Sequence, residues 1–153
     1  MKITDILPEA LVIPALKGKT KEEVLRELAT AMAGQYADID ATRLVEVLWE
    51  RERLGSTAIG DGIAIPHGKL PGLKAVLGAF GRHPQGVDFQ SLDGKPTKLL
   101  FLLVAPEDSV GQHLKALARV SRLLKDPGFR SQLMNAPDQA ELYRYIREED
   151  DKY

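Results

Sequence analysis

Apolar residues recur at helical spacing in both halves of the chain. After the capping box Thr20-Lys-Glu-Glu23, the apolar positions between Val24 and Met32 lie on one helical face. A second helix is predicted from about Asp40, with Leu44, Val47 and Leu48 facing inward. Arg51 follows Leu44 by seven residues, so it extends this apolar stripe. Its stem either covers the core while its head reaches water, or its guanidinium points at an anion.

The middle of the chain predicts strands. The most apolar run, Thr97–Ala105, is typical of a central strand that is buried on both faces. Residues 74–82 predict a second strand and Ile63–Ile65 a brief buried one. His83-Pro84-Gln-Gly86 predicts a turn, with His83 exposed to solvent. Strands between flanking helices predict an α/β fold with a mixed sheet sandwiched between helices.

Helical spacing returns after the central strand. Ser109-Val-Gly-Gln112 predicts a capping box, and His113 falls in the first turn of the helix that follows. Asp126-Pro127 and Asp138 predict the starts of two further helices. The core stripe predicted for the first of these three helices is Leu114, Leu117, Ala118, Ser121 and Leu124.

Composition narrows the class of protein. The chain has 153 residues, which fits one domain over residues 1–153, with 28% charged and 44% hydrophobic residues and a net charge of −1. A charge this close to zero gives no reason to expect binding to nucleic acid. No apolar run is long enough to span a membrane and no signal peptide is visible, so a cytoplasmic location is expected. The absence of cysteine excludes disulfides and thiol chemistry. Histidines, carboxylates and hydroxyls remain for covalent or metal chemistry.

His67 stands between Pro66 and Gly68, at the end of the brief apolar run. Proline holds the preceding residue extended, and glycine lets the backbone turn close to the imidazole. A loop histidine between two turn-forming residues is the simpler interpretation of this triplet alone. The surrounding stretch from Gly55 to Lys69 adds a second possibility.

The stretch around His67 is suited to an anion. Its glycines and hydroxyls can offer donors as phosphate-binding loops do, yet it lacks the spacing of a nucleotide-binding loop, since five residues separate Gly62 from Gly68 and Leu70 replaces the magnesium-binding hydroxyl. Phosphate would then be carried covalently by the histidine. The candidate phosphate-binding residues are Ser56, Thr57, Gly60, Gly62 and Gly68.

The chain resembles the fructose/mannitol-type enzyme IIA family of the phosphoenolpyruvate-dependent phosphotransferase system. The resemblance is carried by Arg51-Glu52, Gly55-Ser-Thr, Ile59-Gly60, Gly62-Ile-Ala-Ile-Pro-His67-Gly, Val87-Asp-Phe-Gln-Ser-Leu-Asp-Gly94-Lys-Pro, Leu99-Leu-Phe-Leu-Leu103 and Gln112-His113-Leu114. It covers most of the chain and is strongest to the nitrogen-regulatory members. Ala58 departs from the glycine that usually follows the Ser-Thr pair in those members, which predicts a stiffer or displaced loop.

The resemblance implies a five-stranded mixed sheet with helices on both faces. It also implies that His67 is phosphorylated on Nε2, with Arg51 and His113 as further active-site residues. Residue spacing alone leaves His113 as a partly exposed polar residue on an amphipathic helix, and Arg53 remains the alternative to Arg51. No metal or cofactor is expected, because Arg51, His113 and hydroxyl groups could stabilise the transferring group.

The implied phosphoryl donor is a histidine-containing phosphocarrier protein. The recipient is either an enzyme IIB domain or a regulatory target protein. Because no membrane or partner domain flanks the chain, a nitrogen-type regulator is predicted, with a sugar-specific fructose or mannitol enzyme IIA as the alternative.

Two other classes of protein stay open. A metal-dependent hydrolase could combine His67 and His113 with a carboxylate such as Asp61, although no closely spaced ligand pair supports it. A binding module that is never phosphorylated would leave the glycine-rich stretch unexplained.

Overall fold

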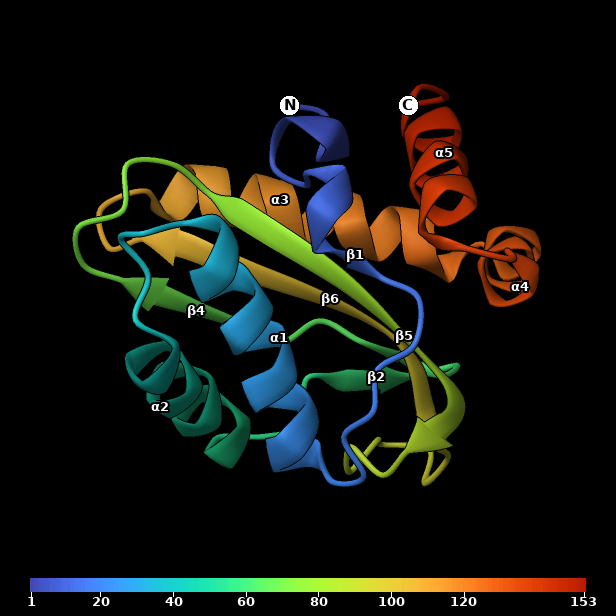
Figure 1. The fold of residues 1–153 in the computed structure, drawn as a ribbon, viewed down its shortest axis with the longest axis horizontal. Helices are drawn as coiled ribbons and strands as arrows, with labels where there is room; N and C mark the ends of the chain where they lie inside the picture. Colours follow the sequence, from blue (N-terminus) through green and yellow to red (C-terminus); the bar gives the residue numbers. More distant parts are fainter.

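A mixed β-sheet lies at the centre of the protein, in a computed structural model that describes residues 1–153 (Figure 1). The strand order is β1-β5-β6-β3-β2, and β4 also pairs with β6. The strands are β1 (Val12–Ile13), β2 (Ala58–Gly60), β3 (Ile63–Ala64), β4 (His67–Leu70), β5 (Leu77–Val87) and β6 (Thr97–Pro106).

β3 and β4 are two parts of one interrupted strand. Both run parallel to β6, and their registers agree, since Ile63 is opposite Leu99 and His67 is opposite Leu103. Pro66 lies in the interruption and has no N–H to donate to a ladder. The predicted mixed sheet between helices is confirmed, and the sheet has six strands rather than five because of this break.

The central strand is β6, as predicted. It pairs antiparallel with β5 on one side and parallel with β3 and β4 on the other. Its side chains are buried at every position except Lys98. Leu99 to Ala105 belong to a hydrophobic core of 41 buried residues that continues into the helices.

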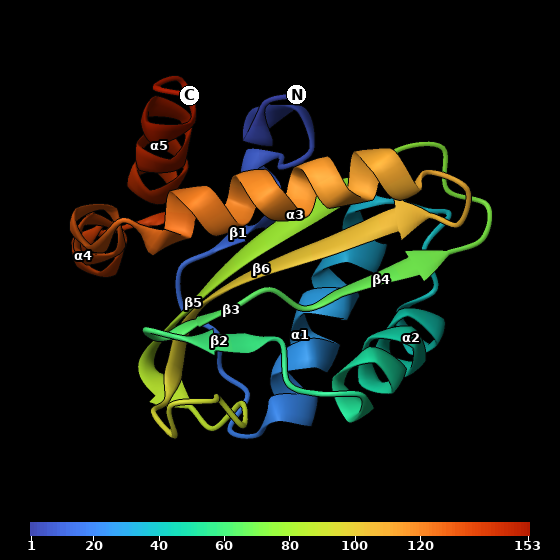
Figure 2. The same cartoon turned by 180° about the vertical axis from the view of Figure 1, so that it is seen from behind.

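Helices cover both faces of the sheet. Figure 1 shows α1 and α2 in front of it, and Figure 2 shows α3 across the opposite face. The shorter α4 and α5 lie beyond one end of α3, and α5 also contacts the N-terminal segment (Figure 2). The bounds are α1 (Lys21–Gln35), α2 (Ala41–Arg53), α3 (Val110–Lys125), α4 (Pro127–Asn135) and α5 (Gln139–Asp150), with 3₁₀ helices η1 (Ile3–Asp5) and η2 (Glu9–Leu11). None of these helices has the length and apolar composition needed to cross a bilayer.

Side-chain caps explain where most helices begin. Thr20 accepts a hydrogen bond from the Glu23 N–H at 3.1 Å, and the Asp40 carboxylate accepts from the N–H groups of Thr42 and Arg43. Asp126 and Asp138 cap α4 and α5 in the same way. The cap predicted at Ser109 is wrong, because its hydroxyl donates to the carbonyl of Pro106 instead.

His83 does not lie in an exposed turn, so that prediction is wrong. β5 continues through residues 83–86 to Val87, and an irregularity between Arg82 and Val87 accommodates Pro84 and Gly86. His83 is only 6% exposed, and its Nε2 lies 2.8 Å from the carbonyl oxygen of Gly18. Pairing with β6 therefore outweighs the local turn propensity.

The buried face of α3 differs from the predicted stripe. Leu114 is 61% exposed, whereas His113 is only 6% exposed. Successive helical residues are turned by about 100°, so a shift of one position exchanges a buried site for an exposed one. The side chains that face the core are His113, Ala116, Val120, Leu123 and Leu124.

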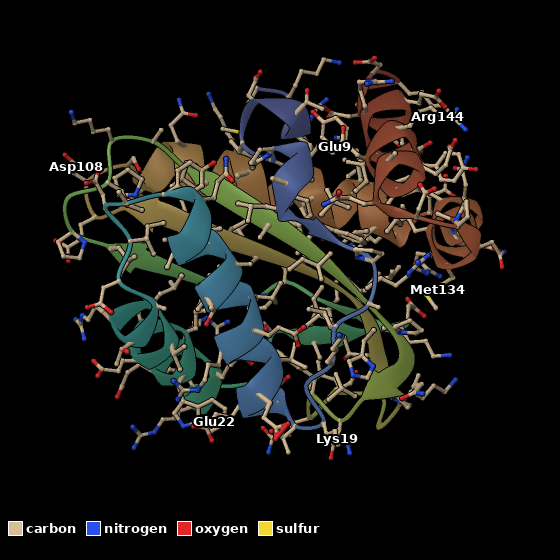
Figure 3. The ribbon with its side chains drawn as sticks, in the orientation of Figure 1. Glu9, Lys19, Glu22, Asp108, Met134 and Arg144 are labelled. Carbon is tan, nitrogen blue, oxygen red and sulfur yellow. The ribbon has the colours of Figure 1, made fainter.

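Charged side chains surround this core. Figure 3 labels Asp108 in the loop between β6 and α3, at the end of the sheet where β4 also ends. Glu22 and Lys19 are labelled near the start of α1, away from that loop. The loop before α3 therefore brings the first turn of α3 close to β4.

Candidate functional site

His67 is the first residue of β4 and lies directly after the break in the strand. Its ring Nδ1 lies 2.8 Å from the carbonyl oxygen of Ile65. A carbonyl only accepts, so Nδ1 carries the proton, and the lone pair of the neutral ring is on Nε2. The ring is half-buried, and this backbone contact determines its orientation.

His113 approaches His67 from α3. The two ring centroids lie 5.5 Å apart, and the ring planes are inclined by 75°. The His113 side chain is buried, and its Nε2 has no hydrogen-bond partner in the protein. The two histidines, 46 positions apart in the sequence, thus form an edge-to-face pair at the end of the sheet.

Both imidazoles are held in their neutral form. Burial lowers the pKa of His67, and the positive charge of Arg51 lowers it further, while the Ile65 carbonyl and the Glu52 charge oppose this. Burial also lowers the pKa of His113, followed by repulsion from His67 and from Lys69. A neutral ring is what nucleophilic attack by nitrogen requires.

Arg51 reaches the same site from the last turn of α2. Its guanidinium Nη1 donates to the carbonyl of Gly55 at 2.9 Å. Arg53, the alternative candidate, instead pairs with Glu50 at 3.0 Å on the exposed side of the helix. Of the two arginines, only Arg51 lines the cavity beside His67.

This cavity is open and measures about 550 Å³. Its rim carries apolar side chains, of which Leu54 is 85%, Val110 53% and Leu114 61% exposed. Exposed apolar side chains that gather at one place on the surface often mark a site that binds other proteins. The lining consists of Val47, Glu50, Arg51, Leu54, His67, Gly68, Lys69, Val110, His113, Leu114 and Leu117.

Gly68 brings α2 close to β4. A Cβ atom at this position would lie 2.6 Å from Cγ1 of Val47, which is too close for any side chain. Glycine therefore permits the close packing that places Arg51 beside His67. Its part in the site is steric, and its backbone lies along the cavity wall.

The remaining candidate phosphate-binding residues lie elsewhere. The Ser56 hydroxyl donates to the carbonyl of Phe89 at 2.6 Å, and the Thr57 hydroxyl donates to the Glu52 carboxylate. Neither residue lines the cavity. Their hydrogen bonds hold the segment between α2 and β2.

Gly60 and Gly62 are also distant from His67. The Gly62 carbonyl accepts from the N–H of Lys98, and β6 then runs five residues, about 17 Å, to Leu103, the partner of His67. Both glycines have positive φ, 103° and 77°, so they form the turn between β2 and β3.

The structure also bears on the metal site that would include Asp61 and on the alanine at position 58. Asp61, the carboxylate of the hydrolase alternative, lies in the same distant turn, and its N–H donates to Asp93 at 3.1 Å. No group of three or more His, Cys, Asp or Glu side chains is arranged to hold a metal ion. Ala58 is fully buried in β2 opposite Ala64, and its φ is not positive, so the segment there does not need glycine.

The sequence-based reasoning missed three features of the site. Lys69 lines the cavity one residue after Gly68, and its proximity to the glycine could have indicated it. The exposed rim was missed because Leu114 was assigned to the core. Glu52 is buried beside the segment that follows α2, and nothing in the local pattern distinguishes it from the neighbouring exposed charges.

Comparison with known protein families shows which family has a site of this kind. Residues 5–149 match the family described as "Phosphoenolpyruvate-dependent sugar phosphotransferase system, EIIA 2". The chain belongs to this enzyme IIA family. The resemblance predicted from the sequence is therefore confirmed, and this enzyme IIA is a component of the phosphotransferase type.

Relatives of this enzyme IIA include regulators and transport proteins. A nitrogen regulatory protein of Bradyrhizobium diazoefficiens is 46% identical over 146 residues, covering 95% of each chain. The fructose-specific EIIABC component of Bacillus subtilis is 39% identical, and the match covers 98% of this chain but 24% of that protein. The crystal structure of the nitrogen regulatory protein IIA-Ntr from Neisseria meningitidis is similar with a TM-score of 0.88 at 32% identity, covering 94% of this chain and 98% of that one.

Proposed function

We propose that His67 accepts a phosphoryl group on Nε2 and passes it on. The observation that carries this proposal is the hydrogen bond from His67 Nδ1 to the Ile65 carbonyl, because it directs the lone pair to Nε2. Membership of the enzyme IIA family supports the phosphotransfer chemistry. The exchange takes place in the cytoplasm and needs no cofactor.

The proposed donor is the phosphohistidine of a histidine-containing phosphocarrier protein. The Nε2 lone pair of neutral His67 forms the new N–P bond as the donor's N–P bond breaks, and the electron pair of that bond returns to the donor nitrogen. Charge accumulates on the three equatorial oxygens of the transferring group. Arg51 and Lys69 supply positive charge beside His67, and Nε2 of His113 is free of other partners.

The rim formed by Leu54, Val110 and Leu114 is the proposed docking surface for the carrier. All three side chains are more than half exposed and surround the cavity that contains His67. Burying them would also exclude water from the transferring group. An enzyme IIB domain or a regulatory target would use the same surface after the carrier leaves.

The direct experiment incubates the protein with phosphoenolpyruvate, the first enzyme of the system and the carrier, and follows the intact mass. One phosphoryl group should be gained, in an acid-labile and base-stable form. A protein that stays unmodified under conditions that phosphorylate a known enzyme IIA would contradict the proposal. Elemental analysis of the same sample tests the hydrolase alternative, which requires bound zinc or another metal.

The pH dependence of acceptance tests the state of His67. Its pKa lies below the ordinary value of 6.5 because of burial and of Arg51, so the reactive neutral ring persists to lower pH than in a free histidine. We expect the rate to fall on acidification with a midpoint below pH 6.5. Among the charged groups, Arg51 opposes protonation and Glu52 favours it, and the other titratable groups that line the cavity with His67 are Glu50, Lys69 and His113. A midpoint above 6.5 in a rate profile or an NMR titration would contradict this assignment.

We propose further that the protein is a regulator rather than a dedicated transport component. The nitrogen regulatory relative from Bradyrhizobium diazoefficiens has higher identity than the fructose-specific one, 46% against 39%, and the match covers 95% of its length. Phosphorylation would add about two negative charges at the apolar rim and so change its affinity for a target.

A pull-down with unmodified wild-type protein and the variants His67→Ala and His67→Glu tests the regulatory proposal. The first two carry no negative charge at position 67, and the glutamate variant adds one. A target should be recovered with the two uncharged forms and lost with His67→Glu, or the reverse. Recovery of a sugar-specific transport domain alone, with transfer to it at a rate that sustains uptake, would favour the transport alternative.

A further inference from the structure

Glu52 is buried at the C-terminal end of α2, although it carries a charge. Its side chain is 2% exposed, and one carboxylate oxygen lies 2.9 Å from Nζ of Lys21, whose side chain is 7% exposed. Burial of an ion pair is costly and is tolerated only where both groups are fully hydrogen-bonded. An apolar pair of similar volume is often at least as stabilising. The ion pair therefore calls for an explanation other than stability.

The Glu52 carboxylate holds Thr57 at two points. One oxygen accepts from the backbone N–H of Thr57 at 3.0 Å, and the other accepts from the Thr57 hydroxyl. Because a carboxylate only accepts, both of these donors are satisfied together with the Lys21 ammonium. A glutamine would turn an N–H₂ group toward one of them.

Thr57 in turn holds the residue that orients His67. The carbonyl of Thr57 accepts from the N–H of Ile65 at 3.2 Å, and the carbonyl of Ile65 accepts from Nδ1 of His67 at 2.8 Å. Pro66 restricts Ile65 to extended backbone and has no N–H of its own. Hydrogen bonds and one short backbone segment thus connect Glu52 to the imidazole.

The same segment is anchored from its other side. The Ser56 hydroxyl donates to the carbonyl of Phe89, and Lys21 Nζ lies 4.8 Å from the centre of the Phe89 ring. Nζ of Lys21 also donates to the side chain of Gln90 at 3.2 Å. Lys21 therefore links the carboxylate and the neighbouring loop, which leaves Thr57 little freedom to move.

We infer that Glu52 is a positioning residue that, through Thr57 and Ile65, keeps His67 in the Nδ1–H tautomer. It does not touch the reacting atoms and lies outside the cavity. The inference deepens the proposed function, since Nε2 can attack only when the proton is on Nδ1. It also assigns Ser56 and Thr57 to the support of the histidine rather than to contact with phosphate.

The test measures the tautomer of His67 by ¹⁵N NMR of the imidazole, without any phosphoryl donor. Two variants weaken the link: Thr57→Val, which removes one donor at nearly constant volume, and the uncharged pair Lys21→Met with Glu52→Gln. Each should lower the ratio of Nδ1–H to Nε2–H by about tenfold, the scale of one lost hydrogen bond. The matched control is Glu46→Gln on the same helix, which breaks an exposed ion pair with Arg43 and should leave the ratio unchanged.

A purely structural role would lower the unfolding temperature without moving the tautomer ratio. An unchanged ratio in folded Thr57→Val would therefore overturn the inference, and this variant decides alone if the double variant does not fold. The tautomer is read before any phosphorylation, so its outcome is separate from that of the proposed function. If the wild-type protein never accepts phosphate, the tautomer result still decides whether Glu52 positions His67.

Discussion

Replacing His67 by alanine is expected to abolish phosphorylation. His67 is the histidine at the cavity whose Nδ1 is bound to a backbone carbonyl, and no cysteine offers another nucleophile. The other two histidines are less accessible, since His83 and His113 are each only 6% exposed. Intact mass after incubation with phosphoenolpyruvate, the first enzyme and the carrier should show no gain in the variant.

The fold should survive this change. The ring is half-buried and makes one backbone hydrogen bond, so the loss of stability should be about 1 kcal/mol. The control is His113→Ala, which also removes an imidazole at the cavity but should still become phosphorylated on long incubation. Full labelling of His67→Ala would show that the nucleophile lies elsewhere.

Replacing Arg51 or His113 by alanine should slow phosphoryl transfer by about 10² to 10³-fold, the usual effect of removing one preorganised donor. Arg51 lines the cavity from α2 and His113 from α3, so each is placed to stabilise charge on one side of the transferring group. Rapid-quench measurement of transfer from the phosphorylated carrier gives the rate. The final extent of labelling should remain complete.

Arg53→Ala provides the matched control for Arg51→Ala. Arg53 lies on the same helical turn but does not line the cavity, and its ion pair with Glu50 is exposed to solvent, so its loss should leave the rate within about twofold. Arg51→Lys should recover part of the rate, because it restores the charge but not the planar fork of donors. Wild-type rates in both alanine variants would assign Arg51 and His113 to structural roles.

Several elements could be predicted from the sequence because their determinants are local. The caps at Thr20, Asp40, Asp126 and Asp138 determine where helices begin, since a side-chain oxygen there meets N–H groups only two or three residues away. β6 was predictable because an uninterrupted apolar run requires burial on both faces.

The backbone around His67 could also be predicted from its neighbours, although the Pro-His-Gly triplet alone favours an ordinary loop histidine. Pro66 and Gly68 are adjacent to it in the chain, and their effects on the backbone are intrinsic to these residue types. The family motifs then indicated Arg51 and His113 as its companions, and the structure brings all three to one cavity.

Which side chains face this cavity depends on how the elements pack together. Neighbouring faces of α3 differ little in hydrophobicity, so the sequence could not show that His113 is buried and Leu114 exposed. Contact with β6 determines which face of the helix is buried. Likewise, the long pairing with β6 carries β5 past Pro84 and buries His83. The local pattern lacks this information because the partner strand is distant in sequence.

The roles of the Ser56 and Thr57 hydroxyls also depend partly on local sequence and partly on distant contacts. Ser56 and Thr57 are close to His67 in sequence and have hydroxyl groups that could bind phosphate, so a polar segment before the histidine was predictable from the residue types. Their partners are Phe89 and Glu52, and the charge of Glu52 is balanced by Lys21, 31 positions earlier. Such a buried pair forms only when α1 and α2 pack together, because neither charge would be stable in the interior alone.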